Sequence, residues 1–182
     1  DSEGAALLLR SYVRYFFPEV KERRLFVSPK VSMVSQSKLR IIPMGGVDEI
    51  GKNMTVFEYE DDIIVVDCGS VFPKEDMLGV DLVIPDVSYL VGKKKNVRGY
   101  LFTHGHEDHI GATPYILRQV PAPLYGTKLT LALIDLKLKE HRVPNISMHV
   151  VQPRDEIQLG KFTCKFIHVS HSIAGACAIA IT

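Results

Sequence analysis

The sequence has no long apolar run, few cysteines and almost no net charge. No uninterrupted apolar stretch approaches the ~20 residues that span a bilayer, so a transmembrane helix is excluded. The three cysteines, Cys68, Cys164 and Cys177, are an odd number and lie far apart in apolar runs. This pattern favours buried thiols in a reducing compartment over a disulfide framework. A formal net charge of +1 neither indicates nucleic-acid binding nor excludes it, since a local groove can still be basic.

The composition is that of a folded globular domain. Hydrophobic residues make up 46% of the chain and charged residues 24%, which excludes wholesale disorder, collagen-like repeats and a coiled-coil rod. A length of 182 residues allows one domain, at most with an additional arm. The chain does not begin with Met and ends directly after an apolar, strand-like run, so we expect a fragment.

Residues 1–38 differ in composition from the rest of the chain. They carry an excess of basic residues, and residues 26–38 are rich in serine with no acidic residue. A short amphipathic helix is predicted over residues 7–17. We expect this N-terminal extension to pack on the body of the protein. An organelle-targeting peptide is the alternative, against which Glu19 and Glu22 argue because such peptides are poor in acidic residues.

From residue 39 onward, short β-rich runs alternate with Gly, Pro, Asn and Asp, which is typical of strands and turns. Strands are predicted at residues 39–43, 54–59, 63–67, 100–103, 123–125, 148–151, 161–169 and 176–181. A hairpin turn is predicted at Asp61-Asp62, and helices are predicted from after His109 to about Gln119 and over residues 127–141. Strands with interposed helices and no internal repeat predict an α/β or α+β layered fold.

The densest group of metal-binding residue types is His104-Gly105-His106-Glu107-Asp108-His109, directly after a predicted strand. His104 and His106 can turn their rings to one side of a strand-end loop, while Asp108 and His109 enter the following helix beside them. Three imidazoles and a carboxylate form a mixed nitrogen and oxygen set that suits Zn²⁺, with Mn²⁺ or Fe²⁺ as alternatives. Unrelated surface histidines are the competing interpretation. The small chance of this pattern after an apolar strand argues against it.

A further metal ligand is predicted at the end of the strand 161–169. His171 lies where that strand gives way to a loop, which makes it the natural candidate. His168 is the competitor. We favour His171, because a histidine in the middle of a strand is more often a half-buried or surface residue.

Asp67 closes the apolar run Ile63-Ile64-Val65-Val66 and precedes Cys68-Gly69. A carboxylate after a buried strand is costly unless it is paired. One interpretation is that it accepts hydrogen bonds from the histidine-rich loop and orients the ligands. The other is a simple Asx turn ahead of Gly69, and spacing alone leaves both open. Cys68 is expected to be a small core residue, since no neighbouring base indicates a nucleophile.

Residues 103–112, Thr-His-Gly-His-Glu-Asp-His-Ile-Gly-Ala, resemble the signature loop of the metallo-β-lactamase superfamily. The flanking segments 43–53, 72–86 and 125–131 narrow the resemblance to the ribonuclease J family of the β-CASP group. The match runs from about residue 39 to residue 182. It is more specific than the histidine-rich loop, which many hydrolases share.

This resemblance implies an αββα sandwich with two zinc ions, Mn²⁺ being possible, of which residues 39–182 form a partial domain. It implies that one ion is bound by His104, His106 and His171 and the other by Asp108 and His109, with Asp67 as the strand-end aspartate that orients ligands. The implied reaction is hydrolysis of RNA phosphodiesters, by endonuclease and 5′-3′ exonuclease action, in RNA processing and decay. A cytoplasmic location and a homo-oligomer of the complete protein are also expected.

Two departures and one gap qualify the resemblance. The chain has Ser172-Ile173-Ala174-Gly175 where the family usually has Ser-Ile-Pro-Asp, which predicts a looser loop, and Asp48 where a small residue is common. The family's bridging aspartate, its β-CASP insertion and a further histidine lie past Thr182. We therefore expect the 182 residues alone to bind metal weakly and to cleave RNA poorly or not at all.

Two other functions stay open at this point. A different hydrolase of the same fold would act on a thioester, a lactam or a small phosphoester, which the histidine-rich loop cannot distinguish. A non-catalytic metal-binding subunit would keep the fold for partner binding. Degenerate ligand positions would indicate such a subunit, yet all five predicted ligands are present.

Overall fold

The structure, a computed structural model, describes residues 37–182. The extension predicted for residues 1–38, its helix over residues 7–17 and the targeting alternative lie, apart from residues 37 and 38, outside the described residues. They stay predictions, and everything below concerns Ser37–Thr182.

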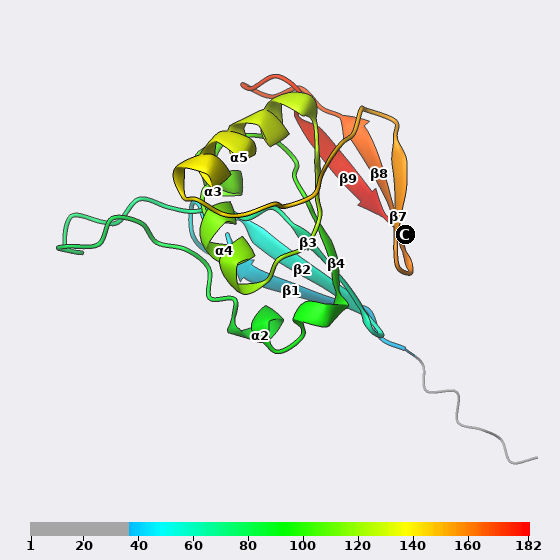
Figure 1. The fold of residues 1–182 in the computed structure, drawn as a ribbon, viewed down its shortest axis with the longest axis horizontal. Helices are drawn as coiled ribbons and strands as arrows, with labels where there is room; N and C mark the ends of the chain where they lie inside the picture. The colour runs from blue at the N-terminus through cyan, green and yellow to red at the C-terminus, as the bar shows by residue number, and fades with distance from the viewer. Residues whose placement is uncertain (1–36) are drawn as a thin grey trace, which may run out of the picture. The chain divides into compact units, whose positions relative to one another are not determined.

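A six-stranded mixed sheet is the centre of the fold (Figure 1). Its strands lie in chain order: β1 (Arg40–Gly45), β2 (Met54–Tyr59), β3 (Asp62–Val66), β4 (Val97–Leu101), β5 (Leu124–Gly126) and β6 (Met148–Val150). The first three strands pair antiparallel, and β3 to β6 pair parallel. A second, antiparallel sheet contains β7 (Glu156–Leu159), β8 (Phe162–His168) and β9 (Cys177–Ile181).

The helices lie in the connections between the parallel strands. They are α2 (Ser88–Val91), the 3₁₀ helix η1 (Lys94–Asn96), α3 (Glu107–Ile110), α4 (Thr113–Gln119) and α5 (Lys128–Glu140). In α5 the side chains of Leu131, Ile134 and Leu138 are buried, a spacing of three and four residues that matches one face of a helix. The helix predicted over residues 127–141 is confirmed.

Alternate side chains of the central strands contribute to two separate cores. On β3, Ile63 and Val65 are buried in the same cluster as Ile116 of α4 and Ile134 of α5. Ile64, between them, is buried with the side chains of the second sheet. Successive side chains of a strand point to opposite faces, so α4 and α5 cover one face of the large sheet and β7–β9 packs on the other (Figure 1). The predicted layered fold is confirmed.

The hairpin turn lies one residue earlier than predicted. The pairing of β2 with β3 begins at Asp62, so Glu60 and Asp61 form the turn instead of Asp61 and Asp62. Glu60 adopts a φ of 54°, as two-residue hairpin loops favour. Asp62 belongs to the strand because its buried carboxylate accepts hydrogen bonds from Arg98 Nε at 2.5 Å and from the Lys161 amide at 2.8 Å.

The differences from the sequence-based prediction are in short elements. The single helix predicted between His109 and Gln119 is divided into α3 and α4, with Gly111 and Ala112 between them. Strand β7 and helix α2 were not predicted. Both are four residues long, and β7 has only two apolar residues, so its pairing with β8 decides its conformation.

All three cysteines are buried free thiols, as predicted. Burial, and next the charge of Asp67, raise the pKa of the Cys68 thiol well above its usual value, which agrees with a core residue that is no nucleophile. None of the helices in the described residues is long and apolar enough to cross a membrane.

Candidate metal centre

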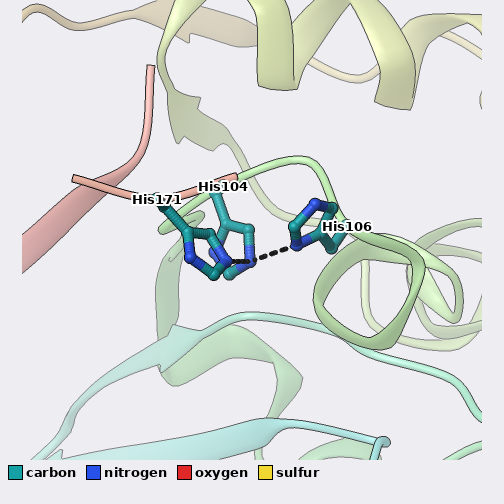
Figure 2. A group of neighbouring side chains, drawn as sticks. All are labelled: His104, His106 and His171. Atoms are coloured by element: carbon teal, nitrogen blue, oxygen red, sulfur yellow. Dashed lines mark hydrogen bonds between the residues drawn. The ribbon is translucent and has the colours of Figure 1, made fainter. Parts of the chain in front are cut away.

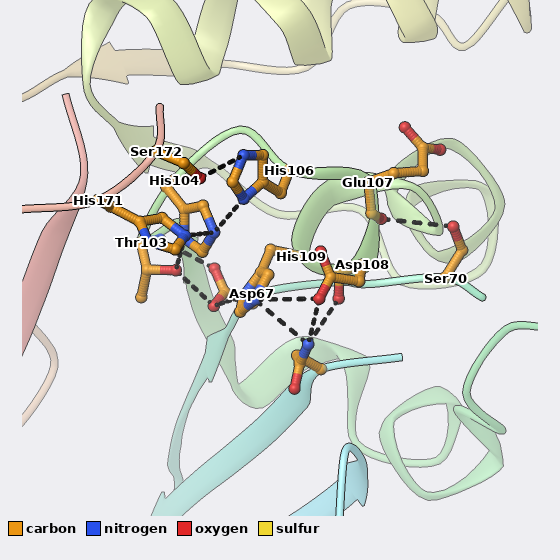
Figure 3. A network of polar contacts seen from close by, with 11 residues as sticks. Asp67, Ser70, Thr103, His104, His106, Glu107, Asp108, His109, His171 and Ser172 are labelled. Atoms are coloured by element: carbon orange, nitrogen blue, oxygen red, sulfur yellow. Dashed lines mark hydrogen bonds and ion pairs between the residues drawn. The ribbon is translucent and has the colours of Figure 1, made fainter. Parts of the chain in front are cut away.

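The predicted ligands gather where the parallel strands β3 and β4 end. Residues 104–109, called the motif loop below, follow β4 and include the start of α3. Asp67 directly follows β3, and His171 lies in the connection from β8 to β9. The carboxyl ends of parallel strands are the usual place for ligand sites in sheets of this kind. Figure 3 shows these side chains facing a common region.

Backbone hydrogen bonds from two neighbouring segments hold the motif loop. Helix α3 is a single turn, and its carbonyl groups accept bonds from outside the helix: the Asn53 amide donates to Asp108 O at 3.0 Å and the Cys68 amide to His109 O at 2.7 Å. Gly69 lies so close to this turn that a Cβ there would collide with the carbonyl oxygen of Asp108. The position of the loop is therefore determined by main-chain contacts.

Asp67 lies at the centre of a buried polar network (Figure 3). Its Oδ1 accepts a hydrogen bond from the Thr103 amide at 2.8 Å, and its Oδ2 contacts the Thr103 hydroxyl at 2.7 Å and His109 Nδ1 at 2.8 Å. An ionised carboxylate only accepts hydrogen bonds, so His109 Nδ1 must carry the proton. In the neutral ring the lone pair of His109 is then on Nε2, the atom that lies 3.5 Å from Asp108 Oδ2.

The same network determines the tautomer of His104. The Thr103 hydroxyl donates its single hydrogen to Asp67, so it accepts from His104 Nδ1, which lies 3.0 Å away. His104 Nε2 is left with its lone pair. One carboxylate thus orients two imidazoles, His104 through a hydroxyl and His109 directly, as the ligand-orienting interpretation of Asp67 requires.

Three imidazole nitrogens from two distant segments converge (Figure 2). His104 Nε2 lies 3.1 Å from His106 Nδ1 and 3.1 Å from His171 Nε2. Nitrogen ligands of tetrahedral Zn²⁺, at about 2.0–2.1 Å from the ion, lie roughly 3.3 Å apart. All three nitrogens lie within 4.8 Å of one another, so they could hold one divalent transition-metal ion. His168 lies on β8 opposite Cys177 and is not part of this cluster.

Asp108 and His109 form a second pair beside the three imidazoles. Asp108 Oδ2 and His109 Nε2 are 3.5 Å apart. The ring centroids of His104 and His109 are separated by 4.1 Å, so the two groups of predicted ligands adjoin each other. The Asn53 side chain contacts both members of the pair. Sequence reasoning did not single out Asn53, because an asparagine ahead of a strand has no distinctive spacing from the motif loop.

Burial and neighbouring charges shift the pKa values of two histidines. Burial, and next the neighbouring His109, lower the pKa of His104 to about 4. Burial also lowers the pKa of His109, but the hydrogen bond and charge of Asp67 and the charge of Asp108 outweigh it, so the net pKa is raised. At neutral pH His104 is uncharged and keeps its lone pair for a metal ion.

The loop that carries His171 is attached to the first turn of α5. The Thr127 hydroxyl donates a hydrogen bond to the Gly175 carbonyl at 2.9 Å. Gly175 adopts a φ of 77°, which favours glycine at this position. Ser172 Oγ lies 3.5 Å from His106 Nε2. Gly175, one of the residues by which this loop departs from the family pattern, is thus held by a contact that the sequence did not indicate.

A sequence model described as the metallo-beta-lactamase superfamily matches residues 47–172. Ribonuclease J of Helicobacter pylori is 45% identical over 154 residues, which are 84% of this chain and 22% of that protein. Ribonuclease J of Thermus thermophilus is 44% identical over 146 residues, covering 76% of this chain and 26% of that protein. The chain thus spans about a quarter of the length of these curated relatives.

Solved structures resemble the fold at lower sequence identity. A protein of unknown function from Enterococcus faecalis superimposes with a TM-score of 0.61 at 20% identity, over 79% of this chain and 40% of that one. The metallo-beta-lactamase fold protein YhfI of Bacillus subtilis gives a TM-score of 0.53 at 18% identity, over 80% of this chain and 58% of that one. At these identities the likeness concerns the fold alone.

Proposed function

Because the chain belongs to the metallo-β-lactamase superfamily, we propose that its converging histidines form the metal centre of a ribonuclease that hydrolyses RNA phosphodiesters. The resemblance to ribonuclease J and the sandwich fold, both predicted from the motifs, are confirmed by the relatives and the fold neighbours. The substrate is proposed from the names of relatives that are 42–45% identical. Endonuclease and 5′-3′ exonuclease action belong to the same proposal.

His104, His106 and His171 would hold one ion, and Asp108 and His109 would contribute to a second. We propose Zn²⁺, with Mn²⁺ as the alternative, because imidazole suits both the geometry and the donor preference of zinc. When bound, such ions supply Lewis acidity that polarises a phosphoryl oxygen and makes water acidic enough to attack near neutral pH. We propose that residues past Thr182 complete the second site, so that these 182 residues alone cleave RNA poorly.

The chain's own residues orient this chemistry. Asp67 holds the protons of His104 and His109 on their Nδ1 atoms, so that both Nε2 lone pairs face the centre. The low pKa of His104 keeps that ring neutral at physiological pH. No protein nucleophile is required. A cytoplasmic location and a homo-oligomer are part of the proposal.

The observation that carries the proposal is the convergence of three imidazole nitrogens, His104 and His106 from the motif loop and His171 from a loop 65 or more positions later in the chain. A hydrolase of small esters or phosphoesters would use a similar centre. A non-catalytic metal-binding subunit would share the fold and the ligands. These two alternatives predict different results in one assay.

The test compares 5′-monophosphorylated RNA with a generic ester as substrates of the full-length protein. We expect cleavage of RNA that is abolished by a chelator, restored by Zn²⁺ or Mn²⁺, and lost in His171→Ala. The matched control is His168→Ala, three positions earlier and outside the cluster, which should remain active. Hydrolysis of the ester without RNA cleavage would favour the small-substrate hydrolase. Bound metal without activity on either substrate would favour the non-catalytic subunit.

A further inference from the structure

The Asn53 side chain makes an unusual set of contacts. Its Nδ2 lies 3.1 Å from Asp108 Oδ2, 3.1 Å from the Asp108 carbonyl oxygen and 3.2 Å from His109 Nε2. These are the two residues that the proposed function assigns to the second ion, and the inference below rests on that assignment. No other side chain in the described residues contacts both the Asp108 carboxylate and His109 Nε2.

The direction in which the Asn53 amide points follows from its partners. A carboxylate and a carbonyl oxygen only accept hydrogen bonds, and in the neutral imidazole, the form that can bind a metal ion, His109 Nε2 is an acceptor because Nδ1 donates to Asp67. All three atoms around the amide are therefore acceptors. Only the NH₂ group can face them, and an NH₂ group has no lone pair with which to bind a metal ion. Asn53 is consequently not itself a ligand in this orientation.

The backbone around Asn53 prevents the side chain from turning away. The backbone N–H of Asn53 donates to the Asp108 carbonyl at 3.0 Å, and the backbone carbonyl of Asn53 accepts from the Gly69 N–H at 2.9 Å. On the other side, a Cβ on Gly46 would lie only 2.6 Å from Asn53 Oδ1. Gly46 adopts a φ of 83°, a backbone conformation that glycine adopts easily. Because glycine has no Cβ, the backbone at Gly46 can pass close to the side-chain oxygen of Asn53. The side-chain amide of Asn53 is therefore held between the segment at Gly46 and the motif loop.

The NH₂ group has two hydrogens for three acceptors. In the metal-free protein, Asp108 Oδ2, the Asp108 carbonyl and His109 Nε2 must share them. If His109 Nε2 held a metal ion, it would no longer be an acceptor. The two hydrogens of Asn53 would then match the two oxygen acceptors of Asp108.

We propose that Asn53 is a positioning residue for the second metal ion: it holds the Asp108 carboxylate beside His109 before the ion binds and keeps Asp108 in place afterwards. The Asp108 side chain is 42% exposed, so without such a donor it could turn to solvent. Asn53 acts through Asp108 and His109 and leaves the three-imidazole site unaffected.

Two substitutions separate this role from a purely structural one. Asn53→Ala removes the donor, and we expect about a 10-fold loss of affinity for the second ion with unchanged affinity for the first, the size typical of partners that orient metal ligands. Asn53→Asp has the same shape but points a carboxylate at the three acceptors. The metal-free Asn53→Asp protein should therefore unfold at a lower temperature than Asn53→Ala, and added metal should raise its melting temperature by more than it raises that of the wild type.

The measurements are bound Zn²⁺ per chain at buffered free zinc and thermal unfolding with and without chelator, in the full-length protein. Asn145→Asp, at an exposed position in the loop before β6, is the control and should match the wild type in both. Equal affinity for the second ion in wild type and Asn53→Ala would overturn the role of Asn53 while leaving the metal centre intact. Equal melting of metal-free Asn53→Asp and Asn53→Ala would also overturn it. A wild-type protein that binds no ion would overturn the proposed function as well.

Discussion

The candidate centre has two halves, the motif loop and the loop that carries His171. Different contacts hold them in place. Main-chain hydrogen bonds from Asn53 and Cys68 fix the motif loop, and Asp67 fixes the rings that project from it. The loop of His171 is held at its ends: the Val169 amide donates to the Ala176 carbonyl, the Cys177 amide donates to the Thr103 carbonyl, and the Thr127 hydroxyl donates to the Gly175 carbonyl. The position of the motif loop is thus part of the fold, whereas that of His171 depends on a few contacts. Substitutions should therefore affect the halves unequally.

The largest effect is expected from Asp67→Ala. The substitution leaves the Thr103 amide, the Thr103 hydroxyl and His109 Nδ1 without their acceptor in a buried site. We expect a loss of about 3 kcal/mol in the free energy of unfolding of the metal-free protein, measured by denaturant titration. Asp81→Ala, at an exposed position, should cost less than about 0.5 kcal/mol. A similar loss for both variants would mean that Asp67 is not a determinant of the motif loop.

Gly69→Ala tests the main-chain half alone. The added Cβ would collide with the Asp108 carbonyl oxygen, so the turn of α3 must move. We expect a loss of about 2 kcal/mol in the free energy of unfolding, together with weaker binding of the second ion. The matched control is Gly92→Ala, where the nearest atom to the new Cβ is 3.9 Å away. If Gly69→Ala is as stable as Gly92→Ala, the motif loop is less constrained than its hydrogen bonds indicate.

Thr127→Val tests the side-chain half. It keeps the shape of the side chain but removes the hydroxyl that bonds the Gly175 carbonyl. We expect about 1 kcal/mol lower stability and about 10-fold weaker binding of the first ion, with the second ion unaffected. Thr127→Ser should restore both values, and calorimetric metal titration measures the difference. Weakening of both ions to the same degree would remove the distinction between the two halves.

The smallest effect at neutral pH concerns the protonation of His104. The pKa of His104 is lowered to about 4, so between its usual value of 6.5 and 4 the unfolded chain binds a proton that the folded protein does not. The resulting stability is complete above pH 6.5 and is lost as the pH falls through about 4. His109 behaves oppositely: its raised pKa contributes stability below its unfolded value that is lost as the pH rises through the folded value.

Denaturant titration of chelator-treated protein from pH 7 to pH 4 tests the direction in which the free energy of unfolding changes with pH. The free energy of unfolding of the wild type should fall toward pH 4, and that of His104→Gln should fall less steeply. Parallel curves for the two proteins would contradict the lowered pKa of His104.

Most elements of the fold could be predicted from local pattern. Short β-rich runs between turn residues indicated β2 and β3, and the composition of residues 127–141 indicated α5. The misplaced turn before Asp62 and the unpredicted strand β7 have a common cause. The ion pair of the buried Asp62 with Arg98 and the pairing of β7 with β8 depend on contacts outside the short run of residues that forms each element. Such contacts leave no trace in a window of a few residues.

In the candidate site, too, local sequence patterns predicted some residues, whereas others depend on contacts between distant parts of the chain. The motif loop was recognisable because its ligand types lie within six residues, and His171 was preferred over His168 because it ends a strand. The structure brings His171 to the motif loop and leaves His168 outside, while their roles as ligands stay proposals. Asn53 was not singled out, and Thr127 was predicted only as the N-cap of a helix, because each acts on a site residue 48 or more positions away.

The amino-acid sequence alone determined the fold class, the reduced state of the thiols and the residue types available to bind a metal ion, since these depend on composition and short spacings. Tertiary structure alone decided which nitrogen of His104 and which nitrogen of His109 keeps the lone pair of the neutral ring. That choice depends on the proton of Thr103, on the carboxylate of Asp67 and on the close approach of three chain segments at the ends of β3 and β4. Hydrogen-bond direction is a property of atoms in contact, and only folding brings these atoms together.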